Sequence, residues 1–573
     1  MGAVIVRRQV PAAAPELHTT PLLQRIYAAR AIRSPRELDN SLGVLAHYDS
    51  LKGIREAVDL LYAALIHQQR TLIVADYDAD GATSCALALR ALQAMGHRNL
   101  GYLVPNRFEH GYGLTPEIVA LAARRQPQLL ITVDNGIASL EGVAEARRRG
   151  MRVLVTDHHL PAEGLPEADA IVNPNQPGDA FPSKHLAGVG VIFYVMAALR
   201  ARLQEAGWFR AKGIPEPGMA RFLDLVALGT VADVASLDHN NRILVAQGLK
   251  RIRAGQCAAG VAALAAASGR PQTRLTAGDM AFGLAPRLNA AGRLEDMSHG
   301  IRCLLCHGNG QALAMAQRLD ALNQERRAIE ADMQAQAMAN LGDLQLTGRE
   351  LPFGLCLYDE GWHQGVIGIL ASRVKEQTHR PVIIFAPDRD GHLKGSARSV
   401  PGLHMRDVLD TVATRHPGVI SRFGGHAMAA GLSLPVKRFE LFCEAFDAEV
   451  RRRLAPEDLC DQLYSDGELS AAEISLEVAE QLRDAGPWGA GFPEPLFDGV
   501  FEVVSWQPLQ DKHVKLILRL AGGDCVEAIA FNRWPTVKAC LDRPRVGIAY
   551  RLDVDEWRGE RRVRLKIEHI EAA

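Results

Sequence analysis

The sequence lacks both an export signal and an apolar run long enough to cross a membrane. Its start, Met1 to Leu17, contains Arg7 and Arg8 but no continuous apolar segment of signal-peptide length. No stretch approaches the ~18 apolar residues of a membrane span. The nine cysteines are scattered, without the spacing of a disulfide framework. We therefore expect a cytoplasmic protein with no membrane attachment.

Neither sign of charge dominates the chain. Its 573 residues include 65 lysines and arginines against 66 aspartates and glutamates. A near-neutral chain has no bulk attraction for a polyanion, which argues against a passive nucleic-acid coating protein. An enzyme that binds a polyanion through local basic patches stays open. The length suggests three or four domains at ~100–200 residues each.

One cysteine motif matches the haem attachment pattern, but we do not expect a haem there. Cys303-Leu-Leu-Cys306-His307 fits the c-type haem attachment pattern. That attachment normally requires export, and a lone CxxC pair supplies too few ligands for a structural zinc site. We interpret Ile301 to Leu305 as an apolar helical stretch whose cysteines pack as small hydrophobic residues.

Strand-like and helical patterns alternate along much of the chain. Short apolar strands separated by amphipathic helices predict a parallel sheet between about residues 66 and 175. A long uninterrupted helix is expected from about 309 to 341, followed by a second α/β unit and then by regularly spaced strands. The predicted regions are an N-terminal leader (1–50), a parallel-sheet catalytic domain (51–240), a helical connector (241–345), an α/β domain (346–455) and an all-β nucleic-acid-binding domain (456–573).

Three aspartates alternate directly after the first apolar strand, in Asp76-Tyr-Asp78-Ala-Asp80-Gly81. Ligands of open α/β sheets bind at the carboxyl ends of the strands. Carboxylates crowded there repel one another unless a cation neutralises them, and hard oxygen ligands suit Mg²⁺, Mn²⁺ or Ca²⁺. The calcium-loop pattern fails because the chain enters an apolar helix at Ala82. Alone, the run is also compatible with a solvated acidic turn.

The next two apolar strands end in similar groups. Asp134 follows the second strand, and Asp157, His158 and His159 follow the third. For each segment alone, a capping aspartate or a hydrogen-bonded histidine is the commoner explanation. Together, the three strand ends predict a shared metal site, for which carboxylate plus imidazole favours Mn²⁺, with Mg²⁺ as the second choice. Asp233, after a further apolar stretch, is either another ligand or a helix cap.

The motifs DYDADG, VDNG, DHH and GTVADVA occur in this order and resemble those of the DHH phosphoesterase superfamily. VPNRFEHGYGL (104–114), APRLNAAGR (285–293) and GHAMAAG (425–431) narrow the resemblance to the RecJ branch. The similarity extends over roughly residues 66 to 570. It implies a multidomain α/β protein with a parallel-sheet DHH domain, a helical connector, an α/β DHHA1 domain and a C-terminal all-β OB-fold domain.

The resemblance also implies two divalent metal ions, usually Mn²⁺. Such a pair can activate water against a phosphodiester, so that no protein nucleophile is needed, and no Ser-His-Asp or Cys-His arrangement is evident. The matching positions supply six ligands and two groups that support them or contact phosphate. One metal would be bound by Asp76 and Asp78, the other by Asp80, His158 and Asp233, with Asp134 bridging both and Asp157 and His159 in support.

Two loops in the first 300 residues carry candidate substrate-binding groups. The glycine-containing segment after Val104 has side chains that could contact phosphate and a ring that could stack on a base. The alternative interpretation is a surface loop with a salt bridge. The basic segment between two apolar helices suggests strand guidance, with helix capping as a competitor. The candidates are Asn106, Arg107, His110 and Tyr112 in the first loop, and Arg287, Asn289 and Arg293 in the second.

The predicted DHHA1 domain and barrel offer further contacts for nucleic acid. A glycine-rich turn (361–368) leads into a helix N-terminus, a common anion-binding arrangement. The resemblance implies that this domain faces the metal site, near the 5′ end of the strand. Mixed aromatic and basic residues of the barrel, including Trp506 and Trp534, are candidates for a stacking platform. The DHHA1 candidates are Ser372, Arg373, Arg398, Gly424, Gly425 and His426.

The function implied by the resemblance is hydrolysis of single-stranded DNA in the 5′→3′ direction, with release of 5′-mononucleotides, in DNA recombination and repair. Expected partners are a single-stranded-DNA-binding protein and a helicase, and we expect a monomer. One alternative is a related enzyme for short oligonucleotides or cyclic dinucleotides, although those relatives generally lack a large OB domain. The other is a non-catalytic replication scaffold, which would have lost metal ligands that this sequence retains.

Overall fold

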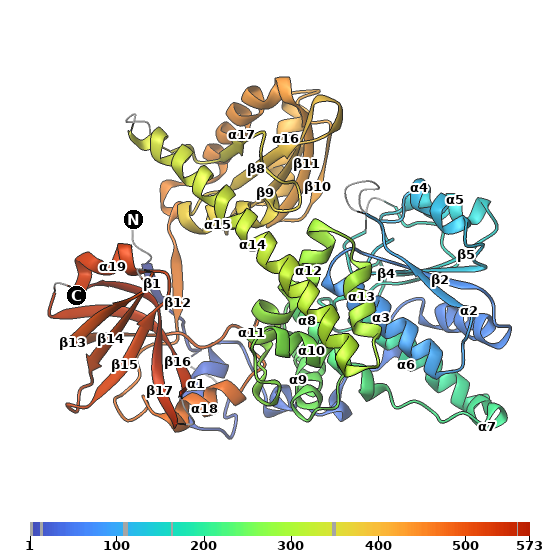
Figure 1. The fold of residues 1–573 in the computed structure, drawn as a ribbon, viewed down its shortest axis with the longest axis horizontal. Coiled ribbons are helices and arrows are strands. Elements are labelled where there is room, and N and C mark those ends of the chain that lie inside the picture. The colour runs from blue at the N-terminus through green and yellow to red at the C-terminus, as the bar shows by residue number, and fades with distance from the viewer. Residues whose placement is uncertain are drawn as a thin grey trace.

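The computed structural model describes residues 4–11, 15–106, 113–161, 164–346, 351–510, 512–541, 543–557 and 560–573. A parallel-sheet domain, a mixed α/β domain and a closed barrel surround a central helical region (Figure 1). This arrangement confirms the predicted fold class. Within these ranges, no helix is both long enough and apolar enough to traverse a lipid bilayer.

The parallel sheet of the catalytic region has the strand order β3-β2-β4-β5-β6. Alternate residues of β2 face opposite layers, with Leu72 and Val74 in one hydrophobic cluster and Ile73 and Ala75 in the other. Helices therefore cover both faces, and the carboxyl ends of β2, β4 and β5 share one edge. The strands are β2 (Thr71–Ala75), β3 (Leu100–Leu103), β4 (Leu129–Val133), β5 (Arg152–Thr156) and β6 (Ala170–Val172); the helices are α2 (Ile54–Ile66), α3 (Ala79–Ala94), α4 (Pro116–Ala123), α5 (Leu140–Arg148) and α6 (Gly188–Glu205).

The N-terminal segment differs from the expected leader because it packs into the core. Helix α1 (Pro21–Ala28) buries Leu22, Leu23 and Ile26. Strand β1 (Val4–Arg7) pairs in parallel with β12 (Gln462–Ser465), which precedes the barrel. The β1–β12 pair joins segments more than 400 residues apart, so no local pattern predicts it. Helix α1 has only eight residues, which is too short for its apolar periodicity to be recognised in the sequence.

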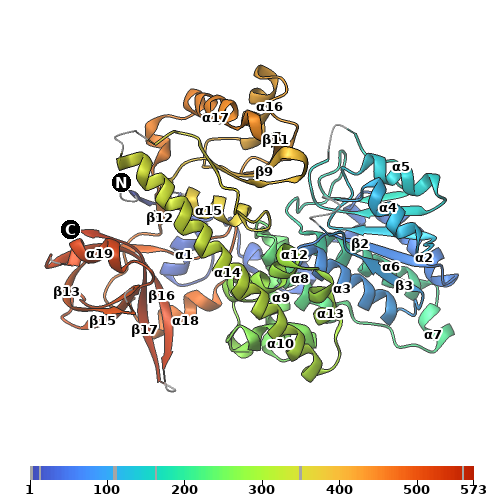
Figure 2. The ribbon, with the colours of Figure 1, turned by 45° about the horizontal axis from the view of Figure 1, so that its top comes forward.

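The helical region links the three sheets. Its longest helix, α14, runs from the central helices up to the α/β domain (Figure 2). Cys303 is buried in α13, and burial raises the pKa of its thiol to about 12, in keeping with its predicted role as a small hydrophobic residue. The helices are α7 (Trp208–Lys212), α8 (Leu223–Ala232), α9 (His239–Arg253), α10 (Ala259–Ala267), α11 (Ala277–Asp279), α12 (Ala285–Leu294), α13 (Ser298–Leu305) and α14 (Asn309–Leu346).

The α/β domain contains a mixed sheet of order β10-β11-β9-β8-β7. Only β7 and β8 are parallel, and the other pairs are antiparallel. The sequence predicted β7, β8 and α15; it did not resolve the glycine-rich strands β9 to β11. The elements are β7 (Leu355–Tyr358), α15 (Ile367–Thr378), β8 (Val382–Pro387), β9 (His392–Arg398), α16 (Met405–Arg415), β10 (Arg422–Gly425), β11 (Ala429–Pro435) and α17 (Phe439–Arg453).

The C-terminal barrel closes in the order β13-β14-β15-β17-β16. Each of its five strands coincides with a strand run that the sequence predicts. Closure pairs the edges of the sheet, as in OB folds. The elements are α18 (Leu476–Asp484), β13 (Phe497–Leu509), β14 (His513–Arg519), β15 (Cys525–Ala530), α19 (Trp534–Leu541), β16 (Arg545–Trp557) and β17 (Glu560–Ala572).

Candidate metal centre and nucleic-acid site

The first aspartate run spans the turn between β2 and α3. Asp78 is the N-cap of α3, and its Oδ1 accepts a hydrogen bond of 2.9 Å from the Gly81 N–H. Asp80 therefore lies in the first turn of α3, which begins at Ala79, ahead of the apolar helical stretch that the sequence places from Ala82. Its buried carboxylate accepts the backbone N–H groups of Gly188 (2.7 Å) and Val189 (3.0 Å) at the start of α6. Two helix N-termini thus stabilise its negative charge.

Asp134 occupies a tight turn after β4. Its backbone is left-handed, with φ 62°, a conformation that aspartate and asparagine tolerate better than most residues. The Asn135 side-chain amide donates to the Val74 carbonyl at 3.1 Å and so ties the turn to β2. A Cβ on Gly188 would lie 2.7 Å from the Asp134 Cβ. Glycine is therefore required for α6 to approach this carboxylate.

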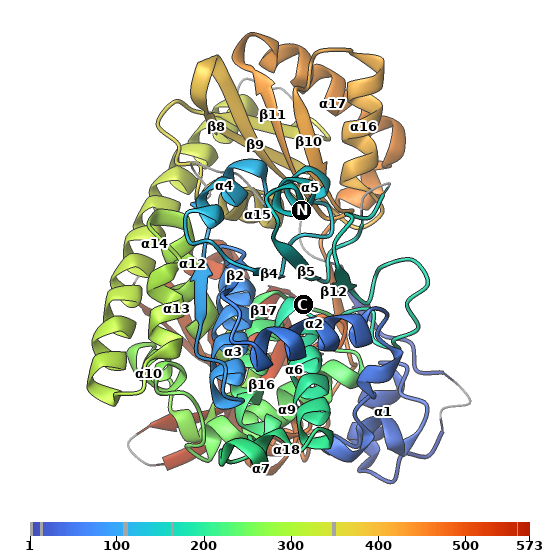
Figure 3. The same cartoon turned by 90° about the vertical axis from the view of Figure 1, so that its right-hand side faces the viewer.

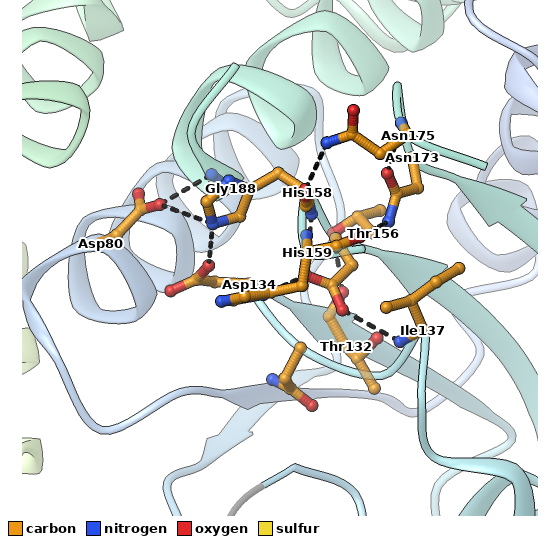
Figure 4. Close-up of polar contacts among 12 residues, drawn as sticks. Asp80, Thr132, Asp134, Ile137, Thr156, His158, His159, Asn173, Asn175 and Gly188 are labelled. Atoms are coloured by element: carbon orange, nitrogen blue, oxygen red, sulfur yellow. Dashed lines mark hydrogen bonds and ion pairs between the residues drawn. The ribbon is translucent and has the colours of Figure 1, made fainter. Parts of the chain in front are cut away.

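The histidine pair after β5 is fixed by buried polar groups (Figure 4). Asp157 accepts hydrogen bonds from the Ile137 N–H (2.9 Å) and the His159 Nδ1 (2.7 Å). Asn173 and Asn175, beyond β6, donate to the carbonyls of His159 (2.9 Å) and His158 (2.6 Å). These contacts hold the backbone of both histidines and orient the imidazole of His159.

The side chains from these segments converge around the imidazole of His158. Its Nε2 lies 3.0 Å from the Asp134 Oδ1, 3.8 Å from the Asp233 Oδ2 and 4.0 Å from the Asp80 Oδ2. Among the described residues, neither this Nε2 nor the buried Asp134 Oδ1 has a hydrogen-bond partner. Three sets each bring one ligand atom per residue within 4.8 Å of the others: Asp134, His158 and His159; Asp80, His158 and Asp233; and Asp76, Asp78 and Asp134.

Burial and mutual repulsion disfavour the charged forms of these carboxyl groups. Burial, together with the charge of Asp78, raises the pKa of Asp80 to about 7. Burial and the charge of Asp80 hold the pKa values of Asp134 and Asp233 well above their usual range. Burial and the charge of His159 lower the pKa of His158 to about 4, so its imidazole is neutral. A divalent cation would relieve all of these penalties, and the oxygen and nitrogen donors suit Mn²⁺ or Mg²⁺.

His159 differs from His158 because it carries a charge at neutral pH. Burial alone would lower its pKa, but the hydrogen bond and charge of Asp157 outweigh burial and raise the pKa to about 9. Burial alone would raise the pKa of Asp157, but the hydrogen bond and charge of His159, together with His158 and the Ile137 N–H, lower it. The ion pair therefore places one imidazolium beside a cluster of acids, where it can contact an anion.

The α/β domain extends over this site from the other side (Figure 3). The ring centroid of His426 lies 6.3 Å from that of His159. His426 follows Gly424 and Gly425 at the turn between β10 and β11. A Cβ on Gly425, where φ is 137°, would lie 2.5 Å from the Ala429 carbonyl oxygen. The glycine permits the tight turn that brings His426 to the metal site.

A partly buried arginine cluster lies beside this turn, on β9. The Arg398 Nε donates to the Ser372 Oγ at 3.2 Å, and its Nη1 donates to the Ser396 Oγ at 3.3 Å and the Ala397 carbonyl at 2.8 Å. A Cβ on Gly368 would lie 3.1 Å from the Arg398 Nη2. Burial lowers the pKa of Arg398. The cluster joins the N-terminal turn of α15 to the sheet, and Ser396 is a member that the sequence did not indicate.

Two other candidate arginines have acidic partners. The Arg373 Nε lies 3.0 Å from Glu330 Oε1, which ties α15 to α14. The Arg287 Nη2 lies 2.7 Å from Asp320 Oδ1, and its Nη1 donates to the Gly283 carbonyl at 2.5 Å. These contacts hold helices together, and contact of either arginine with nucleic acid stays a prediction.

The remaining candidates of the APRLNAAGR segment lie between the domains. The Asn289 Oδ1 accepts a hydrogen bond of 2.8 Å from the Ala79 N–H, at the start of α3, and Arg293 Nη1 donates to the Gly365 carbonyl at 3.3 Å. The segment thus links the metal-site helix to the α/β domain. Asn106 is at the edge of the described residues, and Arg107, His110 and Tyr112 lie outside them.

Comparison with known proteins agrees with this geometry. Three family models match consecutive parts of the chain: DHH family, N-terminal domain (70–230), DHHA1 domain (352–452) and RecJ OB domain (465–569). The single-stranded-DNA-specific exonuclease RecJ of Dickeya dadantii is 53% identical over 577 residues, which cover 100% of each chain. The chain belongs to the family of RecJ single-stranded-DNA-specific exonucleases.

Other RecJ proteins extend the likeness. RecJ of Escherichia coli strain K12 is 51% identical over 96% of each chain. A crystal structure of Thermus thermophilus RecJ in complex with Mn²⁺ matches with a TM-score of 0.81 and 30% identity, over 99% of this chain and 79% of that chain. These matches confirm the RecJ family and the exonuclease class that the sequence motifs predict.

Proposed function

We propose that this RecJ family member removes nucleotides from the 5′ end of single-stranded DNA with the help of two divalent cations. The observation that carries the proposal is the convergence of three buried or partly buried carboxylates on the Nε2 of His158. Thermus thermophilus RecJ has been crystallised in complex with Mn²⁺ and with Mg²⁺, which supports these ions here.

The three ligand sets suggest how the cations are shared. Asp134 belongs to two of the sets, as expected for a bridging carboxylate, and His158 belongs to two as well. When bound, the two cations would supply a water-derived nucleophile at neutral pH and neutralise charge that develops on the phosphate. The proposed ligands are Asp76 and Asp78 for one cation, Asp80, His158 and Asp233 for the other, and Asp134 for both.

His159 and Asp157 would assist at the scissile phosphate. The imidazolium of His159 stays charged because Asp157 holds it at 2.7 Å. It can donate to a non-bridging phosphate oxygen, where a charge-assisted hydrogen bond is stronger than a neutral one. Asp157 has no direct role in bond breaking and acts by orienting and charging His159.

The α/β domain would determine polarity by binding the 5′ end. His426 lies beside His159, and the Arg398 cluster supplies a guanidinium close to the N-terminal turn of α15. A terminal phosphate held there would leave one nucleotide between the pocket and the cations, so that cleavage releases 5′-mononucleotides. The proposed contacts are Asn106, Arg107, His110, Tyr112, Arg287, Asn289, Arg293, Ser372, Arg373, Arg398, Gly424, Gly425 and His426.

The barrel would extend the contact with the strand. The rings of Trp506 and Trp534 lie 5.3 Å apart between centroids, and Phe531 is 41% exposed beside His513. Exposed rings of this kind stack on bases without sequence preference. We further propose a monomeric, cytoplasmic enzyme of DNA recombination and repair that works with a single-stranded-DNA-binding protein and a helicase.

The deciding experiment is digestion of single strands labelled at the 5′ or the 3′ end, with Mn²⁺ and with chelator. We expect a labelled mononucleotide at the earliest times only from the 5′-labelled strand, and no product without a divalent cation. Early mononucleotide release from the 3′ label would refute the polarity. Activity in chelator would refute the metal mechanism, and rapid cleavage of dinucleotides alone would point to the oligonucleotide enzyme.

A further inference from the structure

Asp233, a proposed metal ligand, lies at the start of a strained segment. It is the C-cap of α8, and the next residue, Val234, has a φ of 58°. A β-branched side chain rarely adopts this left-handed conformation, which persists only where the surroundings impose it. Val234 is 70% exposed, so its own side chain supplies little packing. The Asp233 N–H donates to the Gly229 carbonyl of α8 at 2.9 Å, so the strained Val234 lies between this helix end and the residues that follow it.

A loop of the barrel domain contacts this segment. The Leu237 N–H donates to the Ala490 carbonyl at 2.7 Å. A Cβ on Gly491, where φ is 70°, would lie 2.0 Å from the Ser236 Oγ, and one on Gly489 would lie 2.8 Å from the Leu237 Cδ1. The two backbones approach so closely that only glycine fits at position 491.

The loop itself, Gly486–Phe492, is rigidly packed. The rings of Trp488 and Phe492 stack with centroids 5.0 Å apart and planes inclined by 13°. The Trp488 Nε1 donates to the Leu482 carbonyl at 2.8 Å, and the Arg242 guanidinium of α9 lies 4.4 Å from the centre of the Phe492 ring. The loop is thus held by the barrel domain at one end and by α9 at the other.

We propose that the Gly486–Phe492 loop of the barrel domain is a positioning element for the metal-binding carboxylate of Asp233. The inference rests on the proposed two-cation site. Asp233 lies only four positions before Leu237, which is hydrogen-bonded to the loop. Displacement of the loop should therefore weaken the cation served by Asp233 and spare the one served by Asp76 and Asp78.

The test uses Gly491→Ala in the full-length protein, with Gly523→Ala as the matched control. Gly523 lies between β14 and β15, has a φ of 92°, and has no described atom within 4 Å of the point that a Cβ would occupy. Both changes introduce the same left-handed alanine, but only Gly491→Ala also meets Ser236. Adding Ser236→Ala removes the Oγ and leaves a 3.2 Å contact with the Cβ, which a small shift can accommodate.

The readout is Mn²⁺ binding without DNA, followed by the electron paramagnetic resonance signal of free Mn²⁺. We expect Gly491→Ala to weaken one of the two ions by about 10-fold and to leave the other unchanged, as is typical when a group that supports a ligand is lost. Ser236→Ala should restore binding, and Gly523→Ala should have no effect. The kcat of Gly491→Ala should recover at high Mn²⁺, with an unchanged KM for DNA.

Three results would overturn or redirect the inference. Wild-type Mn²⁺ binding by a folded Gly491→Ala protein would refute it, as would equal weakening of both ions without rescue by Ser236→Ala. If Gly491→Ala fails to fold, the milder Gly489→Ala replaces it, because its Cβ meets only the far end of the Leu237 side chain. Binding of one Mn²⁺ ion that is about 2-fold weaker supports the inference, and unchanged binding of both ions refutes it. Failure of the wild type to bind two Mn²⁺ ions would instead refute the proposed function.

Discussion

Two polar clusters face one another across the proposed active site, and they differ in how their charges are satisfied. In the DHH domain, buried carboxylates raise one another's pKa values, and the Asp134 Oδ1 has no described hydrogen-bond partner. In the DHHA1 domain, Arg398 donates to Ser372, Ser396 and a backbone carbonyl. The charges of the first cluster repel one another, whereas the donors of the second have acceptors within the domain.

The contrast between the two clusters teaches that a cation site is easier to recognise from protein atoms than a phosphate site. Like charges in a low-dielectric setting are costly, so a cluster of buried carboxylates by itself indicates a place where a cation can bind. A guanidinium with internal partners gives no such signal, and its substrate role must be inferred from its neighbours. Four experiments, taken in order of decreasing free-energy effect, would test this contrast.

Asp134→Asn should have the largest effect. Asparagine tolerates the left-handed backbone of this position, so the change removes the bridging charge with little strain. We expect kcat to fall by about 10³-fold or more, roughly 4 kcal/mol of transition-state stabilisation. Single-turnover digestion of 5′-labelled DNA at saturating Mn²⁺ measures this. Asp169→Asn, at the opposite end of the sheet, is the control, and activity within 10-fold of wild type in Asp134→Asn would contradict the metal assignment.

Arg398→Lys should come next, because it keeps the charge of the DHHA1 cluster but removes the planar fork of donors. We expect KM to rise by about 10- to 100-fold for a 5′-phosphorylated strand, and less for a 5′-hydroxyl strand. Steady-state kinetics on the two strands separate these effects. Arg389→Ala, on an exposed turn of the same domain, should leave both KM values unchanged, and an equal rise for both strands would argue against recognition of a terminal phosphate.

Asp157→Asn should shift the pH dependence. Without the Asp157 charge, the pKa of His159 should fall from about 9 toward its ordinary value of 6.5. A lower pKa means that the proton is lost at lower pH, so His159 would be mostly neutral at pH 8 in the variant and mostly charged in the wild type. We expect kcat/KM to drop by about 10-fold at pH 8 and by much less at pH 6. Superimposable pH–rate profiles would exclude a catalytic role for the His159 charge.

The smallest expected effect is a gain in stability of metal-free Asp134→Asn. The folded-state pKa of Asp134 is raised, so its ionisation destabilises the folded protein as pH rises above the unfolded-state value. Removing the carboxylate should raise the free energy of unfolding in chelator by about 1 kcal/mol at pH 8, and by less at pH 5. Urea unfolding measures both, and saturating Mn²⁺ should reverse the order of stability.

The sequence could predict that the acids after β2, β4 and β5 lie close together, because parallel strands place their carboxyl ends at one edge of the sheet. The mostly apolar β2 and β4 are recognisable in the sequence, and the acids directly after them lie at the same edge of the sheet. The start of α3 at Ala79 is not fixed by the sequence because each of the three alternating aspartates is a candidate for the N-cap position. The packed N-terminal segment was missed because its partner, β12, lies more than 400 residues away.

Groups that support the site from distant segments were also beyond reach of the sequence. Asn173, Asn175 and Gly188 belong to no recognisable motif, yet they fix the histidines and admit α6. The pairing of Arg373 with Glu330 depends on the path of α14 past α15, which no local pattern encodes. Their roles follow from tertiary distances alone.

The sequence by itself determined the ligand chemistry, since the spacing of acids and imidazoles after apolar strands is a local property of the chain. It also determined the family, through motifs distributed over most of its length. Only the tertiary structure decided which residues hold the ligands in place. The approach of His426 to His159, and of the Gly486–Phe492 loop to the Asp233 segment, arises from domain packing, in which contacts form between residues hundreds of positions apart.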